Sequence, residues 1–184
     1  METAFQFPLR VPELRSAGIL LREMNQEDVP AWYARLLEPE ARTLAGDPEP
    51  NSIEQVHDWL RHHHAAFKSK SGIRWAIQID RVAESVGSIG LVRIDLEART
   101  SEIGTAIAKP YWRKGIVTRA ADLVIDYALN ELGLSKISAD VLSSNVGSIR
   151  ILDKLGFERV SIIRDYRDTA GLKGYLYETR PTAA

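Results

Sequence analysis

Cysteine is absent from the 184-residue sequence. This absence excludes disulfide bonds, thiolate ligands for a metal and a cysteine nucleophile. The sequence also has no run of about 18 apolar residues, the length that a membrane-spanning helix requires. Its first residues lack the basic and then apolar pattern of a secretory signal peptide. We therefore expect a cytoplasmic protein that does not insert into a membrane.

An excess of either charge is lacking as well. The chain has 24 Lys and Arg residues and 25 Asp and Glu residues, for a formal net charge of -1. Nucleic-acid-binding proteins normally carry a basic excess, so this balance argues against that class. No repeat, low-complexity run or linker divides the chain, which is long enough to bury a core of its own. We expect one domain over residues 1–184, with a loose leader over residues 1–15.

The spacing of apolar residues predicts an alternation of helices and strands. Helices are expected from Asn25 to about Leu37, from Asn51 or Ser52 to about Phe67, from about Val117 to Leu132, and from Asn145 to Leu155. The acidic stretch 38–50 contains several proline and glycine residues and is expected to be a loop. Strands are expected over residues 20–23, 73–79, 86–94, 102–108, 137–141, 159–165 and 174–180. This order predicts an α/β fold with a mixed sheet.

A basic, glycine-containing turn stands between the strand that Pro110 ends and the helix that follows. The first N–H groups of a helix have no partners inside it and carry partial positive charge, so such a turn can bind a phosphate. Gly115 allows the backbone to approach a ligand closely, and Arg113 and Lys114 add positive charge. An ordinary turn between a strand and a helix has the same local pattern. The turn alone therefore does not decide the function.

Four segments in sequence order resemble the motifs of the GNAT superfamily, and more narrowly its Rim-type branch of ribosomal-protein alanine N-acetyltransferases. They lie at residues 102–104 (Glu-Ile-Gly), 111–118 (Tyr-Trp-Arg-Lys-Gly-Ile-Val-Thr), 145–148 (Asn-Val-Gly-Ser) and 154–157 (Lys-Leu-Gly-Phe). The resemblance covers nearly the whole chain. It implies a GNAT-like mixed, splayed sheet flanked by helices, with the pantetheine of acetyl-CoA between two parting strands. It implies acetyl transfer from acetyl-CoA to a primary amine, either a protein N-terminus or a small molecule.

The pyrophosphate loop of this family reads Gln or Arg, two variable residues, Gly, a variable residue, and Gly or Ala. It corresponds here to residues 112–117, with Trp112 in place of the first polar residue and Val117 in place of a small residue. Because the phosphates are bound by backbone N–H groups, valine is tolerable if its side chain points away from them. The residues implied to bind acetyl-CoA are Ile107, Ala108, Trp112, Arg113, Lys114, Gly115, Ile116, Val117, Thr118, Asn145 and Ser148.

The resemblance also implies roles for the residues that follow the strand over 137–141. In the family, the serine at the position of Ser148 is placed to protonate the coenzyme A thiolate, and the dipole of its helix would stabilise the developing charge. A simple first-turn serine is the alternative. Asn145 caps the helix, contacts the cofactor, or does both. Because the chain has no cysteine, direct attack in a ternary complex is the simplest route for the reaction.

Two carboxylates are candidates for the general base. Rim-type enzymes can use a carboxylate on the strand after the Gly-Phe turn, and Asp165 is the best match there. The alternative for Asp165 is a surface carboxylate paired with Arg164 or Arg167. Glu102 is the second candidate, because carboxylates on this strand serve as bases in other members. A general base contributes about 10²–10⁴-fold, so its loss need not abolish activity.

The run His62-His63-His64 has the composition of a metal site but not its geometry. Consecutive residues of a helix point in different directions, so the three imidazoles cannot converge on one ion, and we expect no metal. A homodimer is expected by family analogy only. The rival to an enzyme is a non-catalytic acyl-CoA-binding or regulatory module on the same fold. Such a module needs the phosphate-binding turn but neither Ser148 nor a nearby carboxylate.

Overall fold

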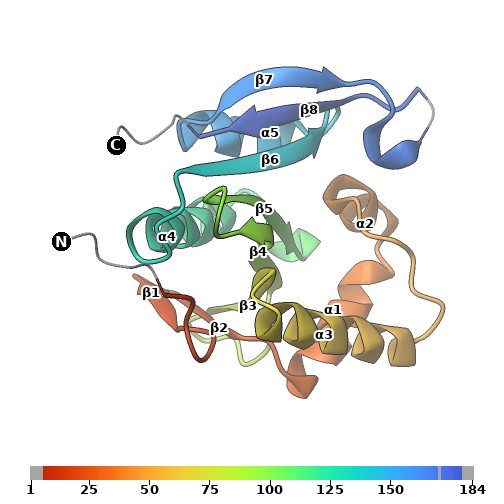
Figure 1. Cartoon of the computed structure of the whole chain (residues 1–184). Coiled ribbons are helices and arrows are strands. Elements are labelled where there is room, and N and C mark those ends of the chain that lie inside the picture. The colour runs from red at the N-terminus through yellow and green to blue at the C-terminus, as the bar shows by residue number, and fades with distance from the viewer. Residues whose placement is uncertain (1–5, 170, 180–184) are drawn as a thin grey trace.

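A computed structural model describes residues 6–169 and 171–179 of the chain. Over these residues, eight strands form one sheet in the order β1-β2-β3-β4-β5-β6-β8-β7. The strands are β1 (Leu14–Ser16), β2 (Ile19–Glu23), β3 (Gly72–Ile79), β4 (Gly87–Asp95), β5 (Thr100–Ile107), β6 (Lys136–Leu142), β7 (Glu158–Ile163) and β8 (Gly174–Glu178). The α-helices are α1 (Val29–Leu36), α2 (Pro39–Ala45), α3 (Ile53–Lys68), α4 (Ile116–Asn130) and α5 (Val146–Lys154) (Figure 1). Short 3-10 helices are η1 (Gln26–Asp28), η2 (Lys109–Tyr111) and η3 (Tyr166–Asp168).

The sheet is mixed, and it splits at its single parallel pair of described strands. Neighbouring strands run antiparallel except β5 and β6. The pairing of β5 with β6 ends at Glu102 opposite Ser138, although β5 continues to Ile107 and β6 to Leu142. The two strands therefore part over the rest of their lengths. The expectation of a mixed, splayed sheet flanked by helices is confirmed.

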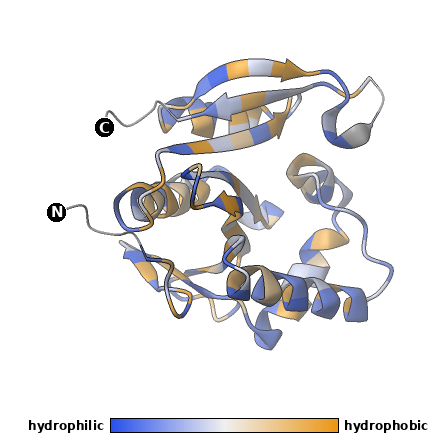
Figure 2. Ribbon diagram, viewed as in Figure 1, coloured by the Kyte–Doolittle hydropathy of each residue, from blue (hydrophilic) through white to orange (hydrophobic). Residues whose placement is uncertain are grey.

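Each face of the sheet packs against its own helices, because successive strand residues point to opposite faces. Trp75 belongs to the main core with residues of α4 and α5, whereas its neighbour Ala76 packs with residues of α1 and α3. Figure 2 shows α3 as mostly hydrophilic with shorter hydrophobic segments, as expected of a helix that buries one side. None of the described helices is long and apolar enough to cross a membrane. The sheet thus separates one layer formed by α1 and α3 from another formed by α4 and α5.

Two local predictions are wrong. The stretch 38–50 is not all loop, because Pro39 starts α2 and Gly46 ends it with a left-handed φ of 68°. Proline suits the first turn of a helix and glycine its end, so both residues punctuate a helix. The prediction of a loose leader over residues 1–15 is also wrong for residues 6–15, which the structure describes. Phe7 and Val11 join the main core, and β1 pairs with β2.

The remaining predicted elements agree with the structure to within a few residues at their ends. The strand predicted over 159–165 ends earlier, at Ile163. The helix predicted after Asn25 begins as η1, and its α-helical part ends at Leu36. Residues 1–5 of the predicted leader and residue 180 of the last predicted strand lie outside the described residues.

Candidate functional site

A long cleft of about 780 Å³ opens at the end of β5, where the sheet splits. Its walls come from α2, from the turn between β5 and α4, and from the first turns of α4 and α5. The lining residues that matter most for a ligand are Lys114, Gly115, Thr118, Asn145, Ser148 and Arg150. The two helix starts therefore face one space, although thirty residues of sequence separate Val146 from Ile116.

The start of α4 leaves backbone donors for a ligand. Gly115 occupies the N-cap position with φ 71°, and no side chain caps the helix there. A Cβ added to Gly115 would meet no atom within 4 Å, so the space over the turn is open. The free N–H groups and the positive end of the helix dipole favour an anion at this point. The turn thus has the geometry of a phosphate-binding site.

Cationic side chains surround this turn. Arg113 and Lys114 are exposed beside it, and Arg150 of α5 lines the cleft from the other wall. None of these three forms an ion pair with a described residue, although Lys114 lies 5.4 Å from the centre of the Tyr111 ring. Their charge is therefore available to an anionic ligand. Arg150 was not predicted, because it lies outside the motif over residues 145–148.

Most of the residues predicted to bind acetyl-CoA line the cleft, with one exception. Ala108 lies instead against a small cavity on the side of Met24 and Trp32, and its N–H donates to Val86 O. The first departure from the family pattern, Trp112, is held by a 2.9 Å hydrogen bond from its Nε1 to the carbonyl of Ile107. Trp112 therefore supports the turn through its indole.

The second departure, Val117, forms part of an apolar wall. It lines the cleft and also a smaller inner cavity of about 90 Å³, together with Ala121 and Ile125 of the same helix. These residues are spaced by four and so share one face of α4. Val117 thus contributes to the wall that the cleft and the inner cavity share.

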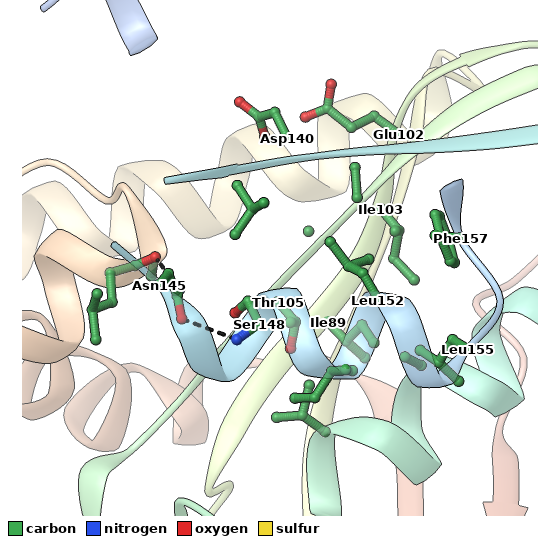
Figure 3. Close-up of a pocket in the computed structure, with 18 of the residues that line it drawn as sticks. Ile89, Glu102, Ile103, Thr105, Asp140, Asn145, Ser148, Leu152, Leu155 and Phe157 are labelled. Atoms are coloured by element: carbon green, nitrogen blue, oxygen red, sulfur yellow. Dashed lines mark hydrogen bonds between the residues drawn. The ribbon is translucent and has the colours of Figure 1, made fainter. Parts of the chain in front are cut away.

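Ser148 and Asn145 stand where the cleft meets the inner cavity, because both residues line both spaces. The Asn145 side-chain oxygen accepts from the Ser148 N–H at 3.0 Å and caps α5 (Figure 3). Its amide nitrogen donates to Leu44 O at 2.9 Å and so holds the end of α2. The Ser148 hydroxyl forms no hydrogen bond with a described residue. The cap thus presents a free hydroxyl at the positive end of a helix.

Two carboxylates lie at the inner cavity on the other face of the sheet. Glu102 of β5 and Asp140 of β6 both line it, and Figure 3 shows them on the opposite side of β6 from Ser148. Glu102 contacts Arg93, which occupies a bulge in β4 with φ 51°. Asp140 lies 3.7 Å from a guanidinium nitrogen of Arg167. The cavity therefore joins a hydroxyl on one face of the sheet to carboxylates on the other.

Asp165, the first candidate for the general base, lies elsewhere. It follows the end of β7, is exposed, and lines neither the cleft nor the inner cavity. Its carboxylate accepts a 2.8 Å hydrogen bond from the N–H of Gly171. Neither Arg164 nor Arg167 forms an ion pair with it. β7 ends at Ile163, two residues earlier than expected, so Asp165 lies in a loop and not on the strand.

The next residue, Tyr166, occupies the site instead. It is buried, lines the inner cavity, and packs over Gly174, where a Cβ would come within 2.2 Å of the ring. Burial and the nearby Asp140 raise the pKa of Tyr166, while Arg167 acts in the opposite direction. The phenol is therefore protonated at neutral pH. Sequence reasoning missed both Asp140 and Tyr166, and only the glycine that accommodates the ring could have indicated the second.

The side chains of the three consecutive histidines do not converge on one point. His62 contacts the carbonyl of Asp58, His63 stacks on Trp32, and His64 contacts the carbonyl of Met24. Burial lowers the pKa of His63 to about 3, so its ring is neutral. The described residues contain no group of three or more side chains placed to hold a metal ion.

Comparisons with known proteins agree with this geometry. Residues 19–158 match the acetyltransferase (GNAT) domain family. Uncharacterized N-acetyltransferase YoaA of Bacillus subtilis is 32% identical over 155 residues, which are 84% of this chain and 88% of that protein. The structure of RimL, a ribosomal L7/L12 alpha-N-protein acetyltransferase in complex with coenzyme A, has a TM-score of 0.81 at 13% identity and covers 92% of this chain and 98% of its own. Spermidine N-acetyltransferase from Vibrio cholerae, in complex with CoA and spermine, has a TM-score of 0.78 at 14% identity and covers 89% and 95%. At these identities the two structures bear on the fold alone.

Proposed function

The chain belongs to the GNAT family of acetyl-CoA-dependent N-acetyltransferases, and we propose that it acetylates a primary amine by direct attack in a ternary complex. The observation that carries the proposal is the position of Ser148 and Glu102 at one inner cavity, at the point where β5 and β6 part. With no cysteine in the chain, a thiol acyl-enzyme is excluded. Holding the two substrates together is then the simplest source of catalysis.

Acetyl-CoA supplies the activated acetyl group as a thioester. In our proposal the first backbone N–H groups of α4, around Val117 and Thr118, bind its pyrophosphate. Arg113, Lys114 and Arg150 neutralise the remaining negative charge. The apolar wall below this turn accommodates the pantetheine chain along the split. The open space over Gly115 and the exposed cations around it support this assignment.

The proton transfers are assigned to residues on the two faces of the sheet. The amine nitrogen bonds to the acetyl carbon, the carbon–sulfur bond breaks, and Glu102 takes the proton that the nitrogen releases. The Ser148 hydroxyl donates a proton to the leaving thiolate and regains one from solvent. The N-terminus of α5 stabilises the charge that develops on sulfur. Asp140 holds the amine beside Glu102.

Two kinds of acceptor fit this scheme. RimL is named for a protein N-terminal amine and the spermidine enzyme for a small polyamine, and both present a primary amine. The acceptor enters from the face of the sheet that carries Glu102 and Asp140. The rival is a non-catalytic acyl-CoA-binding module, which would need none of the groups at the inner cavity.

The test combines binding with turnover. Calorimetric titration with acetyl-CoA is expected to show one site per chain, and absence of binding would contradict both the enzyme and the module. Thiol release is then measured against a panel of small amines and N-terminal peptides. Release with at least one acceptor supports the enzyme. Retained binding with no release across the panel would favour the module.

We also propose that two copies of this chain form a homodimer through the outer strand β7. β7 is an outer strand, and its Val160 and Ile162 are 51% and 65% exposed. An exposed apolar edge strand is a template for pairing with another strand. Antiparallel pairing of two copies about Ser161 would set Val160 opposite Ile162. Light scattering should give the mass of a dimer that Ile162→Lys reduces to a monomer, and a monomeric wild type would contradict this proposal.

A further inference from the structure

A row of residues crosses the acceptor face of the sheet and ends at the inner cavity. Arg74 on β3 pairs with Gly90 on β4, which pairs with Gly104 on β5. A Cβ on Gly90 would lie 2.9 Å from Cδ of Arg74, so the arginine side chain lies over the missing Cβ. Arg74 Nη1 then donates a 3.0 Å hydrogen bond to Gly104 O. Neighbouring strands are about 4.8 Å apart, so the side chain reaches across roughly 10 Å of sheet.

At Gly104, the last residue of this row, the space above the sheet is unfilled. A Cβ on Gly104 would meet no atom within 4 Å, and Gly104 lines the inner cavity. The parallel register that pairs Glu102 with Ser138 would, if continued, set Gly104 opposite Asp140. The strands have parted there, and Gly104, to which Arg74 is hydrogen-bonded, lines the inner cavity together with Asp140. Glu102 borders the same cavity on β5.

Among the described residues, Arg74 lacks the direct carboxylate contact that its arginine neighbours have. Arg35 pairs with Asp47 at 2.9 Å, and Arg167 contacts Asp140 and the carbonyl of Gly46. Arg74 forms no ion pair with a described residue, and its Nε is buried without a hydrogen-bond partner. Burial lowers the pKa of the Arg74 guanidinium, and the more distant charge of Asp47 offsets only part of this effect. Holding a desolvated cation without a carboxylate in direct contact is unfavourable, so binding of an anion beside Arg74 would be favoured.

We propose that the acceptor is an amine that also bears a carboxylate, which Arg74 binds while Glu102 and Asp140 hold the amine. The inference rests on the proposed acetyltransfer and names its substrate class. The open space over Gly104 accommodates the atoms between the two groups. A guanidinium suits a carboxylate because its N–H groups form parallel hydrogen bonds to both oxygens.

The carboxylate has two possible sources with the same chemistry. It is the α-carboxylate of a free amino acid, or it is the acidic side chain that follows the first residue of a peptide or protein. The experiment has an arm for each source. One arm compares free amino acids with their α-amides. The other compares peptide amides that carry aspartate or asparagine at the second position.

The readout is the ratio of kcat/KM within each matched pair, measured by thiol release. In at least one arm the wild-type protein is expected to favour the carboxylate-bearing member by about 10- to 100-fold, as one charged hydrogen-bonded pair provides. Arg74→Gln should remove this preference and leave acetyl-CoA binding unchanged. Arg74→Lys keeps the charge but not the paired donors and should retain part of the preference. A merely structural role for Arg74 would lower both members of each pair equally.

The outcomes separate the two proposals. Thiol release without preference in either arm contradicts the inference and leaves the proposed function intact. Equal losses for both members of a pair in Arg74→Gln also contradict it. If Arg74→Gln does not fold, the inference is tested by the wild-type preference and by its reduction in Arg74→Lys. An unchanged preference in Arg74→Lys would then contradict it. No release from any amine, with acetyl-CoA still bound, contradicts the proposed function and the inference together.

Discussion

The side-chain amide of Asn145 donates a 2.9 Å hydrogen bond to the backbone carbonyl of Leu44, 101 residues earlier in the chain. Through this bond the N-terminus of α5 holds the C-terminal part of α2. An ion pair between Lys109 and Glu40 holds the other end of α2 to the end of β5. One short helix thus bridges both walls of the cleft, and Asn145 links it directly to the turn that carries Ser148.

Two substitutions of Asn145 should distinguish the contributions of its two hydrogen bonds to stability. Asn145→Ser keeps a side-chain oxygen that can cap α5 but loses the donor to Leu44, whereas Asn145→Ala loses both. We expect Asn145→Ala to lower the free energy of unfolding by about 2 kcal/mol and Asn145→Ser by about 1 kcal/mol. Both variants should raise the KM for acetyl-CoA. Urea denaturation and steady-state kinetics measure these effects, and equal unfolding free energies for the two variants would argue against the cap.

Removing the Ser148 hydroxyl should affect chemistry more than binding. Without a proton donor for the thiolate, Ser148→Ala is expected to lower kcat by about 10²-fold, the smaller end of the range for general acid catalysis. Its Kd for acetyl-CoA should stay within about twofold. Ser144→Ala is the matched control, because Ser144 lines the outer cleft but not the inner cavity. If both variants keep the wild-type kcat, Ser148 is not the acid.

Substitutions of Glu102, Asp140 and Asp165 should have different effects on the kinetics. Glu102→Gln removes the proposed base and is expected to lower kcat by about 10²-fold. Asp140→Asn should mainly raise the KM for the amine. Asp165→Asn, which only weakens a loop hydrogen bond to Gly171, should keep kcat within about twofold. Thiol-release kinetics on all three variants test the assignment, and a large loss in Asp165→Asn alone would reverse it.

The bidentate pair between Arg22 and Asp28 should make stability depend on pH. Both carboxylate oxygens of Asp28 lie 2.8 Å from the guanidinium, and one also accepts from Asn25 N–H. Burial raises the pKa of Asp28, but these hydrogen bonds outweigh it, and the net pKa lies below the ordinary value. The pair therefore stabilises the fold above the unfolded-state pKa of about 4, and this contribution is lost as the pH falls through the lower folded-state value.

Asp28→Asn is accordingly expected to lower the free energy of unfolding by about 2 kcal/mol at neutral pH. The difference from wild type should shrink as the pH falls below about 4. Glu13→Gln is the control, since its pair with Arg15 is exposed and such pairs contribute little. Denaturation curves measured from about pH 3 to about pH 7 test this pH dependence. A constant difference over that range would exclude the linkage.

The elements that sequence reasoning placed correctly are those whose signals are local. Alternation marked β3, and Asn145 capped α5 as expected, because a side-chain cap involves residues only three apart. The turn at Gly115 was found for the same reason. The motifs around it also indicated the family and hence the splayed sheet. These features depend on backbone preferences and short spacings, which a single sequence displays directly.

Tertiary structure alone decided which polar groups meet. Asp140 and Tyr166 reach the inner cavity because β5 and β6 part after Glu102, and Asp165 leaves it because β7 ends at Ile163. Arg74 reaches Gly104, thirty residues away, only because three strands lie in register. The sequence by itself thus determined the family, the glycine-containing turn at the start of α4 and the helix that presents Ser148. The arrangement of the proposed acceptor side depended on which strands pair and on where their pairing stops. These are long-range packing outcomes that no local pattern encodes.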